Sequence, residues 1–411
     1  MYRPEKGKFQ LENVNPTLCT HLILAFVLLD ERDISVKLIG NWKDLASDDQ
    51  GQSNITKLKE KYPHLKVLVS IGGWQDGSIK YSKMAANPES RSSFVNNTLE
   101  FIRENNLDGL DLFWEYPTKR GGSLHDKTNL VHLVKELRVA YDKHNLLLTA
   151  GLGASKDTID NGYDVPQLSL YLDYMFMMCY DYSGWWSRII GPNAPLHGPS
   201  LLNVEYTITY MLKLGADPEK LILGIPFYGR PFLRLEATAA ASNASYFGQK
   251  FKNSSFNGPY TQEDGFIAYN EICLELSEQN SNWFIFWDDL SKTPYVVNGE
   301  KFISYDNHRS ISEKIKFALN HELGGVMAWS IDTDDFRGDC NEVVNGQKNY
   351  PLLRAIDQEI HEFLEYQREH PNSIKMGSRV SHVEISVASI ANLSSFIFFV
   401  VFASYFCWNK P

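Results

Sequence analysis

The chain has few cysteines and no long basic run, and both shortages limit what it can be. Its five cysteines are spread widely over 411 residues, at Cys19, Cys179, Cys273, Cys340 and Cys407. They are too few and too scattered for a disulfide framework or a metal knuckle. The net charge is -10 and basic residues occur only in short groups, so nucleic acid is not an expected partner.

Signals for a metal or a phosphate-bearing cofactor are also missing. The 11 histidines show no paired spacing on an expected helix, which zinc-binding helices require. Gly72-Gly73 follows an apolar run, but no Lys-Ser/Thr follows it, as a phosphate-binding loop would need. We therefore expect neither a metal nor a cofactor.

Short apolar runs alternate with amphipathic stretches along most of the chain. The strand-like runs are Thr20–Phe26, Lys66–Ile71, Gly109–Phe113, Leu146–Gly151, Tyr174–Tyr180, Leu221–Ile225 and Gly325–Ser330. Helical stretches between them include Arg91–Asn105, Asp126–His144, Val204–Leu214 and Ser310–His321. This alternation predicts an α/β fold with a parallel sheet and right-handed crossovers. The length of the chain favours a (β/α)8 barrel, although seven runs are one too few to close it.

The segment 107–117 carries the clearest chemical signal. It alternates like a strand, in which every second side chain shares one face. Asp111, Phe113 and Glu115 should therefore point the same way, and Asp108 extends the acidic row. Burying carboxylates at the end of a barrel strand costs free energy, which favours a catalytic role for them.

The row resembles the signature Asp-x-x-Asp-x-Asp-x-Glu of glycoside hydrolase family 18, the chitinases and chitinase-like lectins, with Phe113 at the third Asp. Four further motifs follow the family's order, namely Ser70-Ile71-Gly72-Gly73-Trp74, Met178-Cys179-Tyr180-Asp181, Tyr228-Gly229-Arg230 and Gly324-Gly325-Val326-Met327-Ala328-Trp329. The resemblance extends from Tyr2 to about Leu353. It implies a barrel with a small α+β insertion domain between strands 7 and 8, at about 232–306.

The resemblance also implies roles for the acidic row. Glu115 would be the general acid that protonates the glycosidic oxygen, and the N-acetyl oxygen of the substrate would act as the nucleophile. The third Asp of the family accepts the amide N–H, and Asp111 behind it shares its proton. Phe113 has no acceptor atom, so hydrolysis should be lost or greatly reduced, by at least about 10²–10³ in rate. Phe113 is also compatible with simple barrel packing, and both interpretations can hold together.

The remaining sugar contacts implied by the resemblance look retained. Trp329 would form the floor under the sugar, and Tyr180 would bind the N-acetyl oxygen beside Asp181 and Met178. Tyr228 and Arg230 would line the site, and Trp74 and Trp186 are candidate stacking platforms. For Trp114 we expect packing. Ser183 replaces a histidine that the family usually carries.

The start of the chain differs from the family pattern. Residues 2–9 resemble the loop after the first barrel strand, and residues 1–4 lack the apolar core of a secretion signal. Cys19 resembles a family cysteine whose partner lies in that first strand. We therefore hypothesise that the sequence is truncated at its N-terminus and lacks the first strand, which would leave two exposed sheet edges. Cys273 with Cys340 would match a second family disulfide; two free buried cysteines are the alternative.

The folded domain is expected to end near Ile356. A polar stalk at 357–384 follows, and then the uncharged run 385–408, which is long enough to cross a bilayer or to serve as a glycolipid-anchor signal. Glycosylation sequons occur at Asn54, Asn96, Asn243 and Asn253. Together these features predict a membrane-attached, extracellular glycoprotein with a monomeric ectodomain.

Three functions are consistent with this sequence. The favoured one is a protein that binds chitin or N-acetylglucosamine oligomers with little or no hydrolysis. The second is a working endochitinase in which Asp111 turns toward the substrate and replaces the missing Asp. The third is a protein-interaction or growth-factor-like role, with Phe113 filling a collapsed sugar site.

Overall fold

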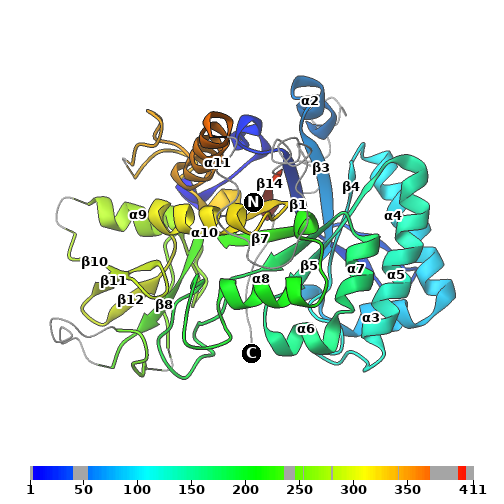
Figure 1. Cartoon of the computed structure of the whole chain (residues 1–411), viewed down its shortest axis with the longest axis horizontal. Helices are drawn as coiled ribbons and strands as arrows, with labels where there is room; N and C mark the ends of the chain where they lie inside the picture. The colour runs from blue at the N-terminus through cyan, green and yellow to red at the C-terminus, as the bar shows by residue number, and fades with distance from the viewer. Residues whose placement is uncertain are drawn as a thin grey trace.

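The computed structural model describes residues 3–39, 54–235, 246–252, 254–278, 281–340, 342–370 and 397–403. A ring of parallel strands occupies the centre, and helices surround it (Figure 1). A second, antiparallel sheet lies to one side of the ring (Figure 1). The predicted barrel with an α+β insertion is therefore confirmed.

The strands are β1 (His21–Asp30), β2 (Ser35–Lys37), β3 (Lys66–Gly72), β4 (Gly109–Phe113), β5 (Leu147–Gly153), β6 (Tyr174–Met178), β7 (Leu221–Pro226), β8 (Tyr228–Leu233), β9 (Ile267–Ala268), β10 (Phe284–Asp288), β11 (Thr293–Asn298), β12 (Lys301–Ser304), β13 (Gly325–Trp329) and β14 (Ile397–Ala403). The α-helices are α2 (Asn54–Lys61), α3 (Ile79–Ala86), α4 (Pro88–Glu104), α5 (Asp126–Tyr141), α6 (Lys156–Gly162), α7 (Val165–Tyr171), α8 (Val204–Lys213), α9 (Tyr269–Ser277), α10 (His308–Asn320) and α11 (Pro351–Glu369). The seven predicted strand runs correspond to β1, β3, β4, β5, β6, β7 and β13.

The central sheet follows the order β14-β13-β7-β6-β5-β4-β3-β1, and pairing between β14 and β1 closes it. Strands such as β4 and β7 are buried along their whole length. One face of each strand points into the barrel and the other lies under the helices, which explains the unbroken apolar runs in the sequence. All carboxyl ends of these parallel strands meet at one end of the barrel, where sites of this fold are built.

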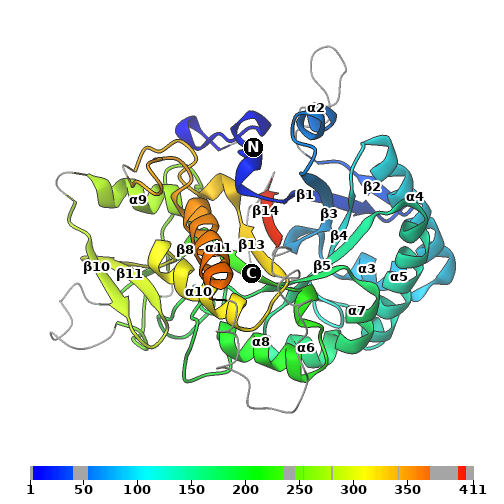
Figure 2. The same cartoon turned by 45° about the horizontal axis from the view of Figure 1, so that its top comes forward.

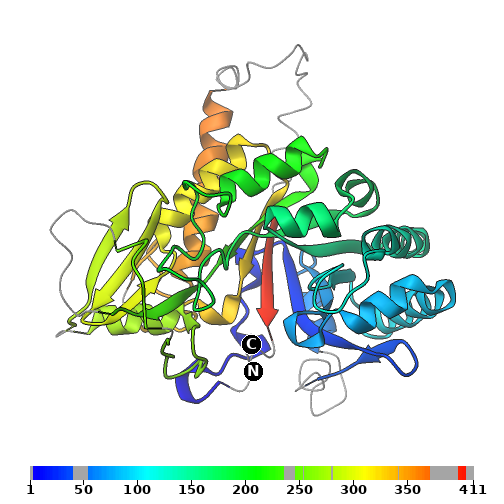
Figure 3. The same ribbon diagram turned by 90° about the horizontal axis from the view of Figure 1, so that it is seen from below.

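β14 is the closing strand, and it corrects the expectation of a seven-stranded barrel. It runs parallel to both neighbours, with Trp329 paired to Val401 and Ala25 to Ala403. Figure 3 shows it in red between β1 and β13. Because β14 lies between the last and the first of the other barrel strands, it covers the two edges that would otherwise be exposed.

The location of β14 also bears on the uncharged run 385–408. Residues 397–403 of that run lie in the barrel, and the rest of it falls outside the described residues. None of the helices described has the length and apolar character to cross a bilayer. Membrane attachment therefore stays a prediction without structural support.

The last described helix, α11, continues past the predicted domain end at Ile356. It packs against α10 (Figure 2), and Ile360 and Phe363 lie against the hydrophobic core. The first residues of the predicted polar stalk are thus helical and partly packed. Residues 371–384 of that stalk lie outside the described part of the chain.

The insertion between the last two barrel strands of the predicted set forms the antiparallel sheet β10-β11-β12-β8-β9. Its small core is mainly aromatic and includes Phe232, Tyr246, Tyr295 and Phe302. The sheet begins at Tyr228, slightly before the predicted boundary.

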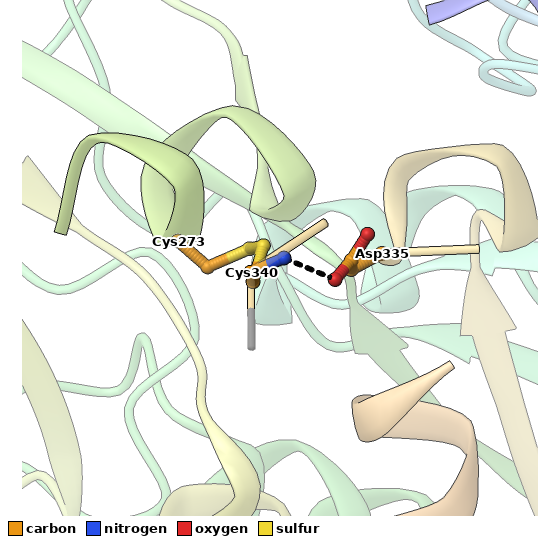
Figure 4. A group of neighbouring side chains, drawn as sticks. All are labelled: Cys273, Asp335 and Cys340. Atoms are coloured by element: carbon orange, nitrogen blue, oxygen red, sulfur yellow. Dashed lines mark hydrogen bonds between the residues drawn. A yellow bond between two sulfur atoms is a disulfide. The ribbon is translucent and has the colours of Figure 1, made fainter. Parts of the chain in front are cut away.

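A disulfide joins α9 of the insertion to the loop after β13. Cys273 and Cys340 are bonded, with 5.5 Å between their Cα atoms, so the predicted pairing is confirmed (Figure 4). The Asp335 carboxylate accepts a hydrogen bond of 2.8 Å from the Cys340 backbone N–H. Although these three side chains cluster closely enough to hold a cation, both sulfurs are used in the disulfide. Cys19 and Cys179 are free and buried, and Cys407 lies outside the described residues.

Candidate functional site

The carboxyl end of β4 presents the predicted acidic row. Asp111, Phe113 and Glu115 are each at most 2% exposed, and their alternation along the strand gives them one face. Asp111 and Phe113 lie within β4, and Glu115 follows its last residue by two positions. The structure therefore brings these three predicted residues together.

Asp108 does not belong to this group. It precedes β4, so it lies at the opposite end of the barrel from Glu115. Its carboxylate accepts from the Val67 backbone N–H at 2.8 Å and pairs with Lys59 at 3.0 Å. The predicted catalytic role is therefore replaced by a structural one, since Asp108 ties β3 and α2 to the start of β4.

Both carboxylate oxygens of Asp111 are occupied. Ser70 donates to one oxygen at 2.6 Å, and Thr149 donates to the other at 2.9 Å. Burial raises the pKa of Asp111 to about 6, although both hydroxyl donors act to lower it. Asp111 is therefore anchored to β3 and β5.

Phe113 occupies the barrel interior as part of an aromatic group. Its ring lies 5.1 Å from Phe26 and 5.5 Å from Trp329, measured between centroids, and those two rings are 5.7 Å apart. A Cβ atom at Gly151 on β5 would overlap the Phe113 ring, so the ring uses the space that glycine leaves open. The packing interpretation of Phe113 is thus confirmed, and its effect on hydrolysis stays a prediction. We call Phe26, Phe113 and Trp329 the aromatic floor.

Glu115 faces several tyrosines. Burial raises the pKa of the Tyr116, Tyr163 and Tyr180 phenols, and the charge of Glu115 raises each of them further. The Arg120 guanidinium donates to the Glu115 carbonyl at 3.0 Å, which fixes the chain just after β4. The Glu115 carboxyl group is thus buried close to several phenols.

Tyr180 follows β6 and carries a buried hydroxyl group. Its oxygen is buried and has no hydrogen-bond partner among the described residues. The charges of Asp181, Glu115 and Asp111 all raise the Tyr180 pKa beyond the effect of burial, so the phenol lies near each of them. A buried hydroxyl without a partner costs free energy, and a ligand that bonds to it removes that cost.

Asp181 is the centre of a hydrogen-bonded network between β6 and β8. Its Oδ1 accepts from the Tyr228 hydroxyl at 2.8 Å and from Arg230 Nε at 2.7 Å. Arg230 also donates to the Gly265 carbonyl at 2.7 Å. Burial alone would lower the Arg230 pKa, but Asp181, together with Tyr228 and Glu263, more than offsets this, so the pKa lies above its usual value. The Asp181 N–H bonds to Asn193 at 3.0 Å.

Among the predicted platforms, Trp74 is partly exposed but already covered on one face. The Arg120 guanidinium lies 3.7 Å from its ring centroid. Trp186 is 36% exposed, and Arg230 lies 5.0 Å from its ring. Both can offer an aromatic face to a ligand, Trp74 only on the face that Arg120 leaves open.

The other residues named from the sequence take mainly packing positions. Trp114 is 2% exposed and stacks on Tyr81 at 5.9 Å, as expected for packing. Met178 ends β6 inside the barrel, and Ser183 bonds to Ser187 at 3.2 Å.

Sequence reasoning did not single out Phe26, Gly151, Arg120 or Asn193 as site residues. Phe26 lay in a predicted strand, so the period of two assigns its side chain to one face of that strand. No local feature of the sequence shows that this face meets β4. Gly151 had a readable signal, because glycine within a strand often marks a close approach.

Comparisons with known proteins give a consistent result. The family model of glycosyl hydrolases family 18 matches residues 1–334. A probable chitinase 2 of Drosophila melanogaster is 46% identical over 383 residues, which cover 87% of this chain and 78% of that protein.

Solved structures agree with this match. The group IV chitinase of Ostrinia furnacalis, in complex with allosamidin, is 38% identical with a TM-score of 0.81, covering 88% of this chain and 96% of that one. Human YKL-39, described as a pseudo-chitinase with retained chitooligosaccharide binding, is 36% identical with a TM-score of 0.77, over 88% and 96% of the two chains.

Proposed function

Because this chain belongs to glycoside hydrolase family 18, we propose that it binds N-acetylglucosamine oligomers at the carboxyl end of the barrel and has lost most or all hydrolysis. The observation that carries this proposal is the Phe113 ring, which stands between Asp111 and Glu115 and belongs to the aromatic floor. Binding by a pseudo-chitinase of similar fold supports the first half of the proposal.

Loss of hydrolysis follows from the chemistry that the family uses. The N-acetyl group of the substrate must be held and its developing positive charge stabilised while Glu115 protonates the leaving oxygen. An aromatic ring at position 113 neither accepts the amide N–H nor stabilises that charge. Losing a preorganised partner of this kind typically costs about 10²–10³ in rate.

Asp111 is poorly suited to replace the missing Asp. Its two oxygens already accept from Ser70 and Thr149. Turning toward a ligand would break both bonds in a buried site, and each broken bond would cost about 1–3 kcal/mol. This argues against the alternative of a working endochitinase.

Retention of binding rests on groups that are already in place. The Tyr180 hydroxyl is buried without a partner among the described residues, which suits a donor to the N-acetyl oxygen. Tyr228 and Arg230 hold the Asp181 carboxylate in one orientation. Because this network is already ordered, a sugar can bind without the free-energy cost of ordering it.

The test is cleavage of a fluorogenic N-acetylglucosamine oligomer by the parent and by Phe113→Asp. We expect cleavage in the variant at least about 10²-fold above the parent. Phe113→Leu is the matched control, because it changes the packing without adding a carboxylate, and Phe113→Asp with Glu115→Gln should be inactive. Equal cleavage by the parent and Phe113→Asp would overturn the claim of lost hydrolysis and favour the endochitinase.

Binding is tested separately by titrating the parent with an N-acetylglucosamine oligomer and recording tryptophan fluorescence and heat. We expect saturable quenching, because Trp329 lies in the floor. An absence of both signals would favour the third function, in which the aromatic floor fills the sugar site. The low exposure of Trp329, which is 5%, is compatible with that alternative.

We further propose that the protein is an extracellular glycoprotein. Asn96 is exposed on α4, where a glycan can project into solvent, and Asn54 begins α2; Asn243 and Asn253 lie outside the described residues. Glycosidase treatment should shift the electrophoretic mobility of the parent, and Asn96→Gln should reduce that shift.

Attachment to a membrane through 385–408 competes with the barrel. Residues 397–403 cannot lie in a bilayer and pair as β14 at the same time. Recovery of the full chain in the membrane fraction would support attachment, and recovery in the soluble fraction would support the strand.

A further inference from the structure

We propose that β10 is a dimerisation edge, on which a second copy of this chain pairs antiparallel through a two-fold axis. The strand contains Phe284, Ile285 and Phe286 in succession, and these side chains are 68%, 62% and 36% exposed. Such a run of exposed apolar residues is unusual on a protein surface and marks an interaction site. This inference is independent of sugar binding and differs from the expectation of a monomeric ectodomain, which stays a prediction.

β10 is also an open edge. Among the described residues it pairs with β11 alone, so its outer side presents unpaired backbone N–H and C=O groups. Edge strands that remain single are usually protected by lysine, proline, a bulge or a covering segment. The residues from Phe284 to Trp287 include neither a charge nor a proline.

One face of β10 continues an aromatic ladder that crosses the sheet. Phe286 stacks on Tyr295 at 5.2 Å with 13° between the ring planes. Tyr295 stacks in turn on Phe302 at 5.2 Å and 23°. Phe284 lies on the same face of β10 as Phe286, since side chains two apart share a face. The ladder therefore reaches the strand edge at Phe286, and the mostly exposed Phe284 lies on the same face.

A second copy extends this ladder without a conflict of charge. If Ile285 of one copy lies opposite Ile285 of the other, Phe284 faces Phe286 of the partner, and the reverse pair follows by symmetry. In that register Asp288 and Asp289 face Asn282 and Ser281, so no like charges are opposed. Self-complementarity of this kind favours a second copy over an unrelated strand.

The register gives a direct test by cysteine cross-linking of the full chain in the cells that produce it. Ile285→Cys should form a disulfide dimer under mild oxidation, because opposite residues in an antiparallel pair are about 4.5–5.5 Å apart between Cα atoms. Leu290→Cys is the matched control, since it is 58% exposed but lies beyond the strand. Both variants carry Cys407→Ser, and the free cysteines Cys19 and Cys179 are buried. Equal cross-linking of the two variants, or none in Ile285→Cys, would refute the register.

Sedimentation equilibrium of the purified full chain gives the second test. We expect a reversible dimer whose dissociation constant rises about 10-fold or more in Phe284→Lys, because symmetry places the change in two cross-strand pairs. Leu124→Lys, at an exposed apolar residue on the barrel, should leave the constant unchanged. A monomer at all concentrations, a dimer insensitive to Phe284→Lys, or open-ended assembly would each overturn the proposal. A monomer whose retention on crystalline chitin is lost in Phe284→Lys would assign β10 to the polymer instead.

Discussion

The β4 corner of the site and the β6–β8 corner differ in how much of their polar character survives. At β4, one aromatic ring replaces a carboxylate, and the space is filled by the aromatic floor. At β6–β8, Asp181 keeps its contacts with Tyr228 and Arg230. The difference is informative because cleavage needs a partner for the transition state, whereas holding a sugar needs only groups that are already oriented. Under the proposed function, one substitution therefore removes cleavage and leaves sugar binding.

The largest expected effect is on the β6–β8 corner itself. Arg230→Met leaves the Asp181 carboxylate without its buried guanidinium, so we expect a loss of about 3–5 kcal/mol in the free energy of unfolding. Urea denaturation measures it. Arg188→Met, at an exposed arginine, should change stability by less than about 0.5 kcal/mol. A small effect at Arg230 would show that this corner is not held by its ion pair.

The contribution of Asp111 to stability at the β4 corner should fall as pH rises, opposite to that of a carboxylate in an ion pair. The Asp111 pKa is raised to about 6 by burial, so its contribution to stability is present below its usual pKa and is lost as pH rises through 6. The stability of Asp111→Asn relative to the parent should therefore increase by about 2.4 kcal/mol from pH 4 to pH 7. Denaturation at several pH values, with Asp108→Asn as the contrasting variant, checks this. A flat difference would mean that Asp111 is not buried as described.

The fit of Phe113 against β5 predicts a coupling between two positions. Gly151→Ala should destabilise the parent by about 1–3 kcal/mol, because the new methyl group overlaps the Phe113 ring. In a Phe113→Asp background the same change should cost less. A double-mutant cycle on unfolding free energies gives the coupling, and additive effects would contradict the contact.

The smallest effect separates stability from binding at Tyr180. Removing its buried hydroxyl in Tyr180→Phe should leave stability unchanged or raise it by about 1 kcal/mol, since no described residue bonds to it. Affinity for an N-acetylglucosamine oligomer should nevertheless fall about 10-fold. Tyr163→Phe is the contrasting variant, because the Tyr163 hydroxyl accepts from the Gly153 N–H at 2.9 Å and its loss should reduce stability instead. Unchanged affinity in Tyr180→Phe would remove Tyr180 from the sugar site.

Most of the barrel could be predicted because each strand is a local apolar run. The period of two within β4 was enough to place Asp111, Phe113 and Glu115 on one face. The sequence motif grouped Asp108 with these residues, whereas the structure places it before β4. A motif records only the order of residues, and whether a residue falls before the strand or at its end decides which end of the barrel it reaches.

The sequence by itself determined the strands, the order of the motifs, and the aromatic ring at position 113. The tertiary structure alone decided how that ring is packed, that Asp111 is held by Ser70 and Thr149, and that the Tyr180 hydroxyl is left without a partner among the described residues. It also placed residues 397–403 in the sheet. An apolar run of that kind is equally compatible with a buried helix, a membrane segment or a strand. In the structure, residues 397–403 pair with the edges of both β13 and β1, which the curvature of the whole barrel brings close together.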